Sequence, residues 1–575
     1  MTTFLKNNFA AATFIALIAA VIFIPFIGNC PLFDWDEVNF AECAREMVTS
    51  GNYSLVQLNY RPFWEKPPLF IWLQAASMNL FGVNEFAARF PNAICSIVSL
   101  VSIFMAGKKF HSIHFGALWS FLYAATLLPH LYFKSGLIDP WFNLFIFLSL
   151  YHCIQFLNNP SGKKQIVNAL VAGLFLGLAV LTKGPAALVI VALTLGCFIL
   201  WNRQFGVLLS RSFLIFVVTT LFISGSWFLI EYLKGNGKLI SEFVTYQLRL
   251  FETGDSGHDG PFIYHFVVLL LGCFPASLIF IISYLKYSDL TPYQRLYRKL
   301  FICLFWVVLI LFSVVKTKIV HYSSLCYFPL TFVAGIGLVN YFSVLKFNGF
   351  LKTFYWLITG LFTVAFVAIG LINYIKPWLL NSGLIADEFA VQNLQAEVHW
   401  TGFESLIAVI FLLSSWLIYK AITHHKTRLL YYGLAANLLF IYLAIAVIIP
   451  KVELYTQHAA IAFYKAHAGP DCYVETHGFK SYAYLFYSAR RPGDYNNPDQ
   501  VAFIEQQLDK MVEEGHSRFT SFSTANLLWM ENGKIDRPAF IVVKTIQEQE
   551  LLGTPGFKKL YSQNGFSFFV RMPAK

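Results

Sequence analysis

Acidic, basic and polar aromatic side chains gather in six short clusters, which long apolar runs separate along the chain. The first cluster holds Asp36 and Glu37, and the second contains Glu65 and Lys66. The four later clusters are Asp139-Pro140, Thr182-Lys183-Gly184-Pro185, Gly257-His258-Asp259-Gly260, and Lys316-Thr317-Lys318 with His321 and Tyr322. Residues so far apart form one site only if the apolar runs between them fold back on one another.

These residue types suit the transfer of a group away from a phosphate. A carboxylate such as Asp36, with Glu37 and Asp139 as further acids, can orient a nucleophile and remove its proton. Lysines bind phosphate oxygens as point charges, and a tyrosine hydroxyl donates a hydrogen bond to them. The candidate phosphate ligands are Lys66, Lys183, Lys318 and Tyr322.

A divalent metal ion is a further candidate at such a site. Imidazole and carboxylate ligands suit Zn or Mn, so Glu65 and His258 are the candidate ligands. Two ligands are fewer than a protein metal site generally uses, and Mg fits the carboxylate as well. The need for a metal therefore stays open at this point.

The apolar runs between the clusters make up most of the chain. Of the 575 residues, 57% are hydrophobic and only 13% are charged, whereas a soluble protein carries roughly 25% charged residues. This composition excludes a soluble enzyme, a disordered chain and a fibrous protein. The net charge of +11 does not indicate nucleic-acid binding, because no basic cluster interleaves with exposed aromatic residues.

The apolar runs predict about thirteen transmembrane helices, since one span needs roughly 17–25 mostly apolar residues. The predicted spans are 9–28, 88–107, 113–133, 138–157, 166–182, 185–201, 212–232, 262–284, 299–315, 323–343, 352–374, 402–420 and 428–449. The segment 29–87 is too polar to lie in lipid, and we expect short interfacial helices there. The central thirds of the spans contain no Asp, Glu, Lys or Arg, which argues against an ion-coupled transporter.

The charges of the short loops orient the predicted spans. If the N-terminus lies in the cytoplasm, every inside loop carries at least two Lys or Arg residues, in agreement with the positive-inside rule. The basic residues of these loops are Lys108, Lys109, Lys163, Lys164, Arg203, Arg211, Lys286, Arg295, Arg298, Lys299, Lys346, Lys352, Lys420, Lys426 and Arg428. All six polar clusters then fall on the outer face, as a single extracytoplasmic site requires.

Each cluster also has a purely structural interpretation. Asp36 with Glu37, and separately Asp139, suit the N-termini of helices, where acids are favoured. Lys183 suits a side chain that reaches lipid headgroups, and His258 an ordinary surface histidine. The shared location of all the clusters, rather than any one of them, favours a functional site.

The composition changes near residue 450, where charges become frequent and apolar runs shorten to the length of strands. A turn signal at Asn564-Gly565 precedes the last of these runs. The expected strands are 472–474, 540–543 and 566–570, and helical spacing is found at 479–488 and 498–514. We therefore predict a transmembrane part at 1–449 and an extracytoplasmic α/β domain at 450–575.

The motifs of the segment 29–87 resemble those of a known family. Asp36-Glu37, Ala44-Arg45-Glu46-Met47 and Glu65-Lys66-Pro67-Pro68 resemble the first external loop of the bacterial aminoarabinose transferases of lipid A. They are also similar to the wider dolichyl-phosphate-mannose–protein mannosyltransferase-like relatives of those enzymes. The resemblance continues through Phe81-Gly82, Glu85-Phe86-Ala87-Ala88-Arg89, Asp139, Thr182-Lys183-Gly184-Pro185, His258, Lys318 and Tyr322, within residues 1–330.

The resemblance implies a mainly helical GT-C fold and a glycosyltransferase that takes a sugar from a polyprenyl-phosphate carrier with inversion. It implies that Asp36 is the catalytic carboxylate and that Asp139 steers the acceptor or the sugar. The other implied roles are phosphate binding for Lys66, Lys318 and Tyr322, and a shared metal for Glu65 and His258.

One departure from the family pattern concerns the acceptor. The aminoarabinose transferases usually read Asp-Glu-x-Arg-Tyr, whereas this chain reads Asp36-Glu37-Val38-Asn39-Phe40. The missing Arg argues against an anionic acceptor such as a lipid A phosphate. It leaves room for a sugar hydroxyl or for a protein Ser or Thr.

We therefore expect a monomeric, multi-pass glycosyltransferase of the bacterial inner membrane, with a cytoplasmic N-terminus and a periplasmic C-terminal domain. The expected donor is a sugar on undecaprenyl phosphate or a similar carrier, and the expected acceptor is a lipid or glycan among the surrounding membrane lipids. The alternatives are a protein O-glycosyltransferase of the same fold, a flippase for lipid-linked sugars, and a structural membrane protein. The sequence does not identify the sugar, the acceptor or the carrier length.

Overall fold

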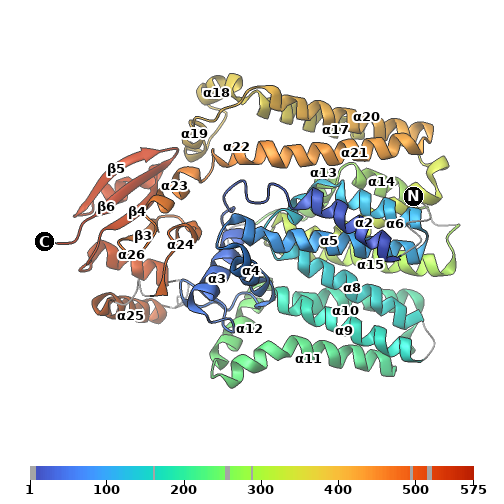
Figure 1. The fold of residues 1–575 in the computed structure, drawn as a ribbon, viewed down its shortest axis with the longest axis horizontal. Coiled ribbons are helices and arrows are strands. Elements are labelled where there is room, and N and C mark those ends of the chain that lie inside the picture. The colour runs from blue at the N-terminus through green and yellow to red at the C-terminus, as the bar shows by residue number, and fades with distance from the viewer. Residues whose placement is uncertain are drawn as a thin grey trace.

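The computed structural model describes residues 8–158, 162–252, 259–286, 289–492, 497–514 and 521–574. These residues form a bundle of long apolar helices and a smaller α/β domain at the C-terminal end (Figure 1). The helices α3 (Asp36–Ser50) and α4 (Leu69–Phe81) lie where the two parts meet. The predicted fold class, mainly helical with a C-terminal α/β domain, is confirmed.

A helix lies in every predicted span. Nine helical segments of the described chain are long and apolar enough to cross a membrane. They are α5 (Glu85–Phe110), α8 (Asp139–Asn158), α9 (Lys163–Lys183), α11 (Arg211–Leu233), α15 (Pro292–Val314), η3 with α16 (Val320–Asn340), α17 (Gly349–Gly370), η5 with α20 (Phe403–His424), and α21 through α22 (Thr427–Glu453).

The remaining predicted spans hold bent or shorter helices. The pair α13 (Tyr264–Gly272) and α14 (Ala276–Ser283) is bent by 108° and counts as a tenth span if it crosses as one unit. The shorter apolar helices are α2 (Asn8–Phe23), α6 (Ile113–Ala124) followed by α7 (Leu127–Phe133), and α10 (Ala186–Asn202).

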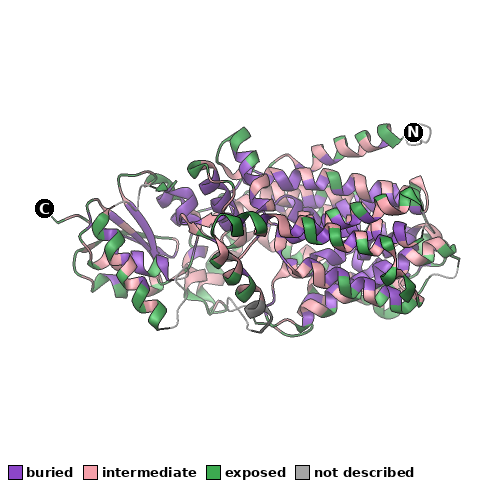
Figure 2. Ribbon diagram, turned by 90° about the horizontal axis from the view of Figure 1, so that it is seen from below, coloured by how far each residue is buried: buried purple, intermediate pink, exposed green. Residues whose placement is uncertain are grey.

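Small residues let the helices of the bundle approach closely. On α9, a Cβ added to Gly173 would lie 2.6 Å from the carbonyl oxygen of Phe216, and one added to Gly177 would lie 2.5 Å from Cβ of Ile223. These glycines are four residues apart and share one helix face, as is common where membrane helices pack. Figure 2 shows buried residues inside the bundle and exposed residues along its outer faces.

The C-terminal domain is built on a four-stranded sheet. Its strand order is β3-β4-β6-β5, with β3 and β4 parallel and the other pairs antiparallel. The strands are β3 (Tyr473–His477), β4 (Ala539–Lys544), β5 (Phe557–Gln563) and β6 (Phe566–Arg571), and the helices are α23 (His458–Ala466), α24 (Ala483–Tyr487), α25 (Pro498–Glu513), α26 (Phe522–Asn532) and α27 (Gln549–Leu552). The three expected strands and both expected helical regions are present, and β5, α23, α26 and α27 are additional.

The domain is docked on the segment that precedes and contains α3 and α4. The Tyr487 hydroxyl accepts a hydrogen bond from the backbone of Leu32 at 2.7 Å, and the Tyr60 hydroxyl donates to the carbonyl of Arg490 at 2.6 Å. Apolar residues of α3, α4, α23 and α24 share one core. The domain therefore helps to hold the segment 29–87 in place.

A buried ion pair fixes the start of that segment to the bundle. The Arg89 guanidinium on α5 donates to both carboxylate oxygens of Glu37 at 2.8 Å. It also donates to the carbonyls of Ile27, Cys30 and Pro31, each at 2.8 Å. Glu37 is only 2% exposed, so in this structure it holds the start of α3 in position, and the catalytic role expected from the sequence stays a prediction without geometric support.

Replacing Arg89 by Ala should therefore destabilise the protein strongly. Removal of Arg89 leaves the buried Glu37 carboxylate without its counter-ion, at a cost of about 3–5 kcal/mol. Thermal unfolding in detergent measures the loss. The control is Arg61→Ala, which removes a half-exposed ion pair with Glu505 and should cost less than about 1 kcal/mol. Equal melting temperatures for the two variants would contradict the assignment.

Candidate functional site

Residues from three helix ends and one 3₁₀ helix converge at the end of the bundle that faces the C-terminal domain. Asp36 begins α3, Asp139 begins α8, Lys183 ends α9, and His321 lies in η3 (Val320–Cys326). The Nε2 atom of His321 is 3.4 Å from Oδ2 of Asp36 and 3.8 Å from Oδ2 of Asp139. Nζ of Lys183 is 2.7 Å from Oδ1 of Asp139. We refer to these four residues as the acid–histidine–lysine cluster.

Two further predicted residues, Tyr322 and Lys66, border this cluster. The Lys183 ammonium lies 5.0 Å from the centroid of the Tyr322 ring, and the Lys66 ammonium lies 5.3 Å from that of Tyr246. The charges of Lys66 and Lys183 both act on Asp36. The structure thus brings together five of the predicted residues, namely Asp36, Asp139, Lys66, Lys183 and Tyr322.

The cluster keeps Asp36 ionised. Burial alone would raise its pKa, but the hydrogen bond and charge of His321, together with Lys66 and Lys183, outweigh burial and lower it to about 2. The side chain is nevertheless 39% exposed, so solvent weakens these charge effects and leaves the carboxylate accessible to a substrate. An accessible carboxylate with a low pKa orients a partner well and is only a weak proton acceptor.

The turn that delivers Asp36 has an unusual backbone. Trp35 precedes the helix with φ of 71°, a left-handed conformation that bulky residues rarely adopt. The C-terminal domain contacts this turn, because the backbone of Tyr482 donates to Asp34 at 3.2 Å and the Lys480 ammonium lies 5.4 Å from the Trp35 ring centroid. Surrounding structure of this kind is what sustains a strained turn at a site.

Lys318 has its hydrogen-bond partners outside this cluster. Its ammonium donates to the carbonyls of Phe312 at 3.1 Å, Ser313 at 2.7 Å and Val315. These carbonyls belong to the C-terminal end of α15, where a positive charge is favourable. In this arrangement Lys318 caps a helix, and phosphate binding by Lys318 stays a prediction without geometric support.

The described residues supply only part of the predicted metal site. Glu65 accepts a hydrogen bond from the Tyr246 hydroxyl at 3.2 Å, whereas His258 lies outside the described residues. Within the described ranges, no group of three or more His, Cys, Asp or Glu side chains is arranged to hold a metal ion. Glu65 alone does not make a metal site, so we assign no chemistry to a metal here.

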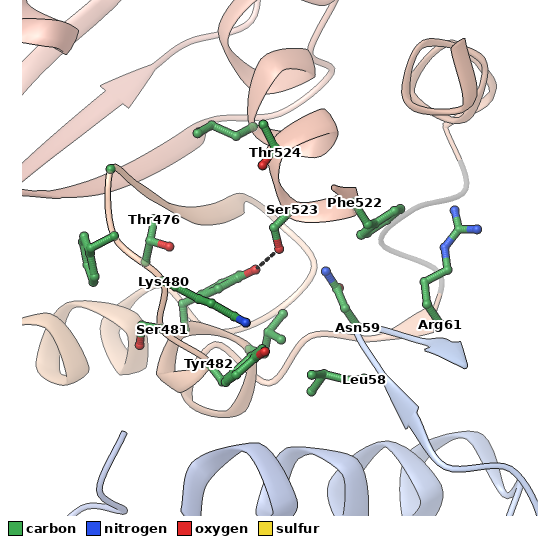
Figure 3. Close-up of a pocket in the computed structure, with 15 residues that line it drawn as sticks. Leu58, Asn59, Arg61, Thr476, Lys480, Ser481, Tyr482, Phe522, Ser523 and Thr524 are labelled. Carbon is green, nitrogen blue, oxygen red and sulfur yellow. Dashed lines mark hydrogen bonds between the residues drawn. The ribbon is translucent and has the colours of Figure 1, made fainter. Parts of the chain in front are cut away.

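A pocket of about 330 Å³ lies between the segment 29–87 and the C-terminal domain. Its polar lining residues include Asn59, Arg61, Lys480 and Ser523, and the Tyr484 hydroxyl lies 3.2 Å from the Ser523 hydroxyl (Figure 3). A second cavity of about 730 Å³ shares Lys480 with the first and is also lined by Trp35. The second cavity therefore adjoins the turn that carries Asp36.

Sequence reasoning did not assign a role to His321, although it noted the residue beside Lys318 and Tyr322. The available signal was its position in a polar cluster at the start of a span. An imidazole there can pair with acids from other helix ends, and in the structure it contacts two of them.

Replacing His321 by Asn should shift the pH dependence of the site. The variant loses the interactions that lower the pKa of Asp36, so this pKa rises and protonation occurs at higher pH. In the wild-type protein the lowered pKa of Asp36 keeps its carboxylate ionised. The stability that this ionised group contributes is fully present above about pH 4 and is lost only as the pH falls towards 2. Infrared titration of the carboxylates should show the shift. The exposed control His424→Asn should leave the titration unchanged, and an unchanged titration in His321→Asn would contradict the assignment.

Lys318 and Lys183 should respond differently to substitution. Lys318→Met removes a helix cap and should lower stability by about 1–3 kcal/mol while polyprenyl phosphate still binds. Lys183→Met should weaken that binding at least tenfold. Thermal unfolding and native mass spectrometry with added undecaprenyl phosphate measure the two effects. A loss of binding in Lys318→Met at unchanged stability would reverse the assignment.

Comparisons with known proteins agree with the geometry. Residues 65–229 match the family described as dolichyl-phosphate-mannose-protein mannosyltransferase. The undecaprenyl phosphate-alpha-4-amino-4-deoxy-L-arabinose arabinosyl transferase of Shewanella sediminis is 24% identical over 388 residues, or 65% of this chain and 70% of the relative. The enzyme of the same name from Photorhabdus laumondii is 25% identical over 350 residues, or 60% of this chain and 63% of the relative.

The overall architecture also has a solved counterpart. The crystal structure of ArnT from Cupriavidus metallidurans bound to undecaprenyl phosphate has a TM-score of 0.72 to this chain. The match covers 97% of both chains at 18% sequence identity, so it shows a shared fold from the first helix to the C-terminal domain. The chain thus has the GT-C fold of a membrane protein and is similar to the aminoarabinose transferases, as its motifs predicted.

Proposed function

We propose that this protein is a membrane glycosyltransferase that moves a sugar from a polyprenyl-phosphate carrier to an acceptor outside the cytoplasm. The observation that carries the proposal is the acid–histidine–lysine cluster with Lys66 and Tyr322, which combines an accessible carboxylate with phosphate-binding side chains. The names of the relatives, and the ligand of the Cupriavidus metallidurans structure, support undecaprenyl phosphate as the carrier.

The lysines act on the donor side of the reaction. Lys183 is held by Asp139 at 2.7 Å, which fixes the position of its ammonium. Lys66 supplies a second positive charge near Asp36. As the bond between the anomeric carbon and the phosphate oxygen breaks, these charges stabilise the departing polyprenyl phosphate. The Tyr322 hydroxyl is the proposed hydrogen-bond donor to the same phosphate.

Asp36 acts on the acceptor side. It orients the acceptor oxygen for attack on the anomeric carbon from the face opposite the phosphate, so the product has inverted configuration. A hydroxyl acceptor passes its proton to Asp36 late in the reaction, because a carboxylate with a pKa of about 2 is a weak base early on. A phosphate acceptor is already ionised and has no proton to transfer.

The structure removes one argument against an anionic acceptor. Asn39 stands where the aminoarabinose transferases usually have Arg, but its side chain is buried at 6% exposure and contacts the Cys43 thiol. The Asn39 side chain therefore lies inside the protein, which is consistent with an acceptor that binds elsewhere. The cavities next to Trp35 instead offer Lys480 and Lys544, so we propose an anionic lipid or glycan as the acceptor.

The membrane orientation belongs to the same proposal. The basic loops favour a cytoplasmic N-terminus, so that the cluster and the C-terminal domain lie on the periplasmic side of a bacterial inner membrane. We propose that one chain is sufficient for activity, because all the groups of the cluster come from a single chain.

Asp36→Asn tests the proposal directly. In lipid nanodiscs with an undecaprenyl-phosphate-linked aminosugar and lipid A, the variant should lose at least a thousandfold in turnover while donor binding persists. Mass spectrometry of the acceptor measures transfer. The control Asp499→Asn changes an exposed acid at the start of α25 and should leave turnover unchanged.

The other outcomes separate the alternatives. Near wild-type turnover in Asp36→Asn would remove its catalytic role. Modification of added peptides instead of lipid would select a protein O-glycosyltransferase. Movement of intact donor across the membrane without bond cleavage would select a flippase and overturn the proposed activity.

A further inference from the structure

A second basic pocket lies at the opposite end of the bundle. This cavity of about 520 Å³ is lined by Trp201 and Asn202 at the end of α10 and by Arg295, Arg298 and Lys299 near the start of α15. The other end of α10 directly follows Lys183-Gly184-Pro185 at the candidate site. The 17 residues of α10 span about 25 Å, so one phosphate cannot occupy both places.

The charge of this pocket is one-sided. Three of its lining residues are cations, and none of the described residues that line it is acidic. The Lys299 ammonium donates to Oδ1 of Asn202 at 2.9 Å and lies 5.4 Å from the Trp201 ring centroid. Arg295 is exposed. Cations in a pocket whose described lining contains no acid, placed between helices at a membrane surface, attract anionic headgroups.

An apolar groove continues from the basic pocket. This groove has a volume of about 480 Å³ and lies along α13, α14 and α15. Tyr284 and Leu285 line both the pocket and the groove, which makes the two continuous. The indole of Trp306 donates to the Tyr284 hydroxyl at 2.9 Å, so an aromatic pair marks the junction between the polar and apolar parts.

The dimensions suit one lipid of a single leaflet. Lys299 lines the pocket and Leu309 lines the groove, and both lie on α15. Leu309 lies ten positions after Lys299, which corresponds to a helical rise of about 15 Å. This is half of a hydrocarbon core of about 30 Å. A headgroup at Lys299 thus places an acyl chain along the groove as far as the middle of the bilayer. Tryptophan and tyrosine at the headgroup level match the usual aromatic belt.

We propose that this pocket and groove bind one anionic glycerophospholipid of the leaflet opposite the candidate active site. The phosphate lies among Arg295, Arg298 and Lys299, and one acyl chain fills the groove. By the positive-inside rule this is the cytoplasmic leaflet. The site is separate from the proposed donor and acceptor sites and does not depend on the proposed function.

Native mass spectrometry with added phospholipids tests the proposal. The purified protein should bind one phosphatidylglycerol more tightly than phosphatidylethanolamine, and Arg295→Gln with Lys299→Gln should weaken that binding at least tenfold. The matched control, Lys346→Gln with Lys352→Gln, removes two exposed cations of the same membrane face outside the pocket and should bind as the wild-type protein does.

A second variant separates lipid binding from folding. Ile281→Trp places a large side chain at an exposed position that lines the groove, 43% exposed, and leaves the cations unchanged. It should weaken binding of phosphatidylglycerol but not of free glycerol phosphate.

Three results would overturn the proposal. One is equal binding of anionic and zwitterionic phospholipids, and another is equal binding by the pocket variant and its control. The third is displacement of bound phosphatidylglycerol by equimolar undecaprenyl phosphate in the wild-type protein but not in the pocket variant, which would assign the pocket to the polyprenyl carrier instead.

Discussion

The contact of one imidazole with two carboxylates holds the proposed site together. His321 lies 3.4 Å from Asp36 and 3.8 Å from Asp139, and these acids come from helices that begin about a hundred residues apart. Two carboxylates at such proximity repel each other unless positive charge lies between and beside them. Lys183 supplies such a charge beside Asp139, and the His321 imidazole lies between the two acids, so the geometry of the site depends on where η3 and the end of α9 place these side chains.

The Arg89–Glu37 pair and the C-terminal domain hold Asp36 in position for this contact. The Arg89–Glu37 pair anchors the first turn of α3 to α5, and the C-terminal domain contacts the strained turn at Trp35. The domain thus has a mechanical role in addition to its proposed role at the acceptor side. This explains why residues more than four hundred positions apart share one core and several hydrogen bonds.

Much of this arrangement could be predicted from the sequence because apolar periodicity and loop charge determine which helix ends lie on the same side. Asp36, Asp139 and Lys183 lie together for that reason. A catalytic role for Glu37 stays a prediction without geometric support, because the sequence does not show that its carboxylate is buried against Arg89. The capping role of Lys318 could be recognised only from the tertiary structure, because nothing in the local sequence shows that its ammonium turns back to the carbonyls at the end of α15. Strand β5 was missed because its residues are mostly exposed and form no apolar run.

The central claim is that the carrier phosphate lies among Lys66, Lys183 and Tyr322, beside Asp36. An experimental structure of the protein in nanodiscs with undecaprenyl phosphate tests this claim most directly. We predict phosphate density within about 3 Å of the Lys183 ammonium and the Tyr322 hydroxyl, with Asp36 on the opposite side of the space left for the sugar. Phosphate density elsewhere, with Lys183 still paired only to Asp139, would contradict the account.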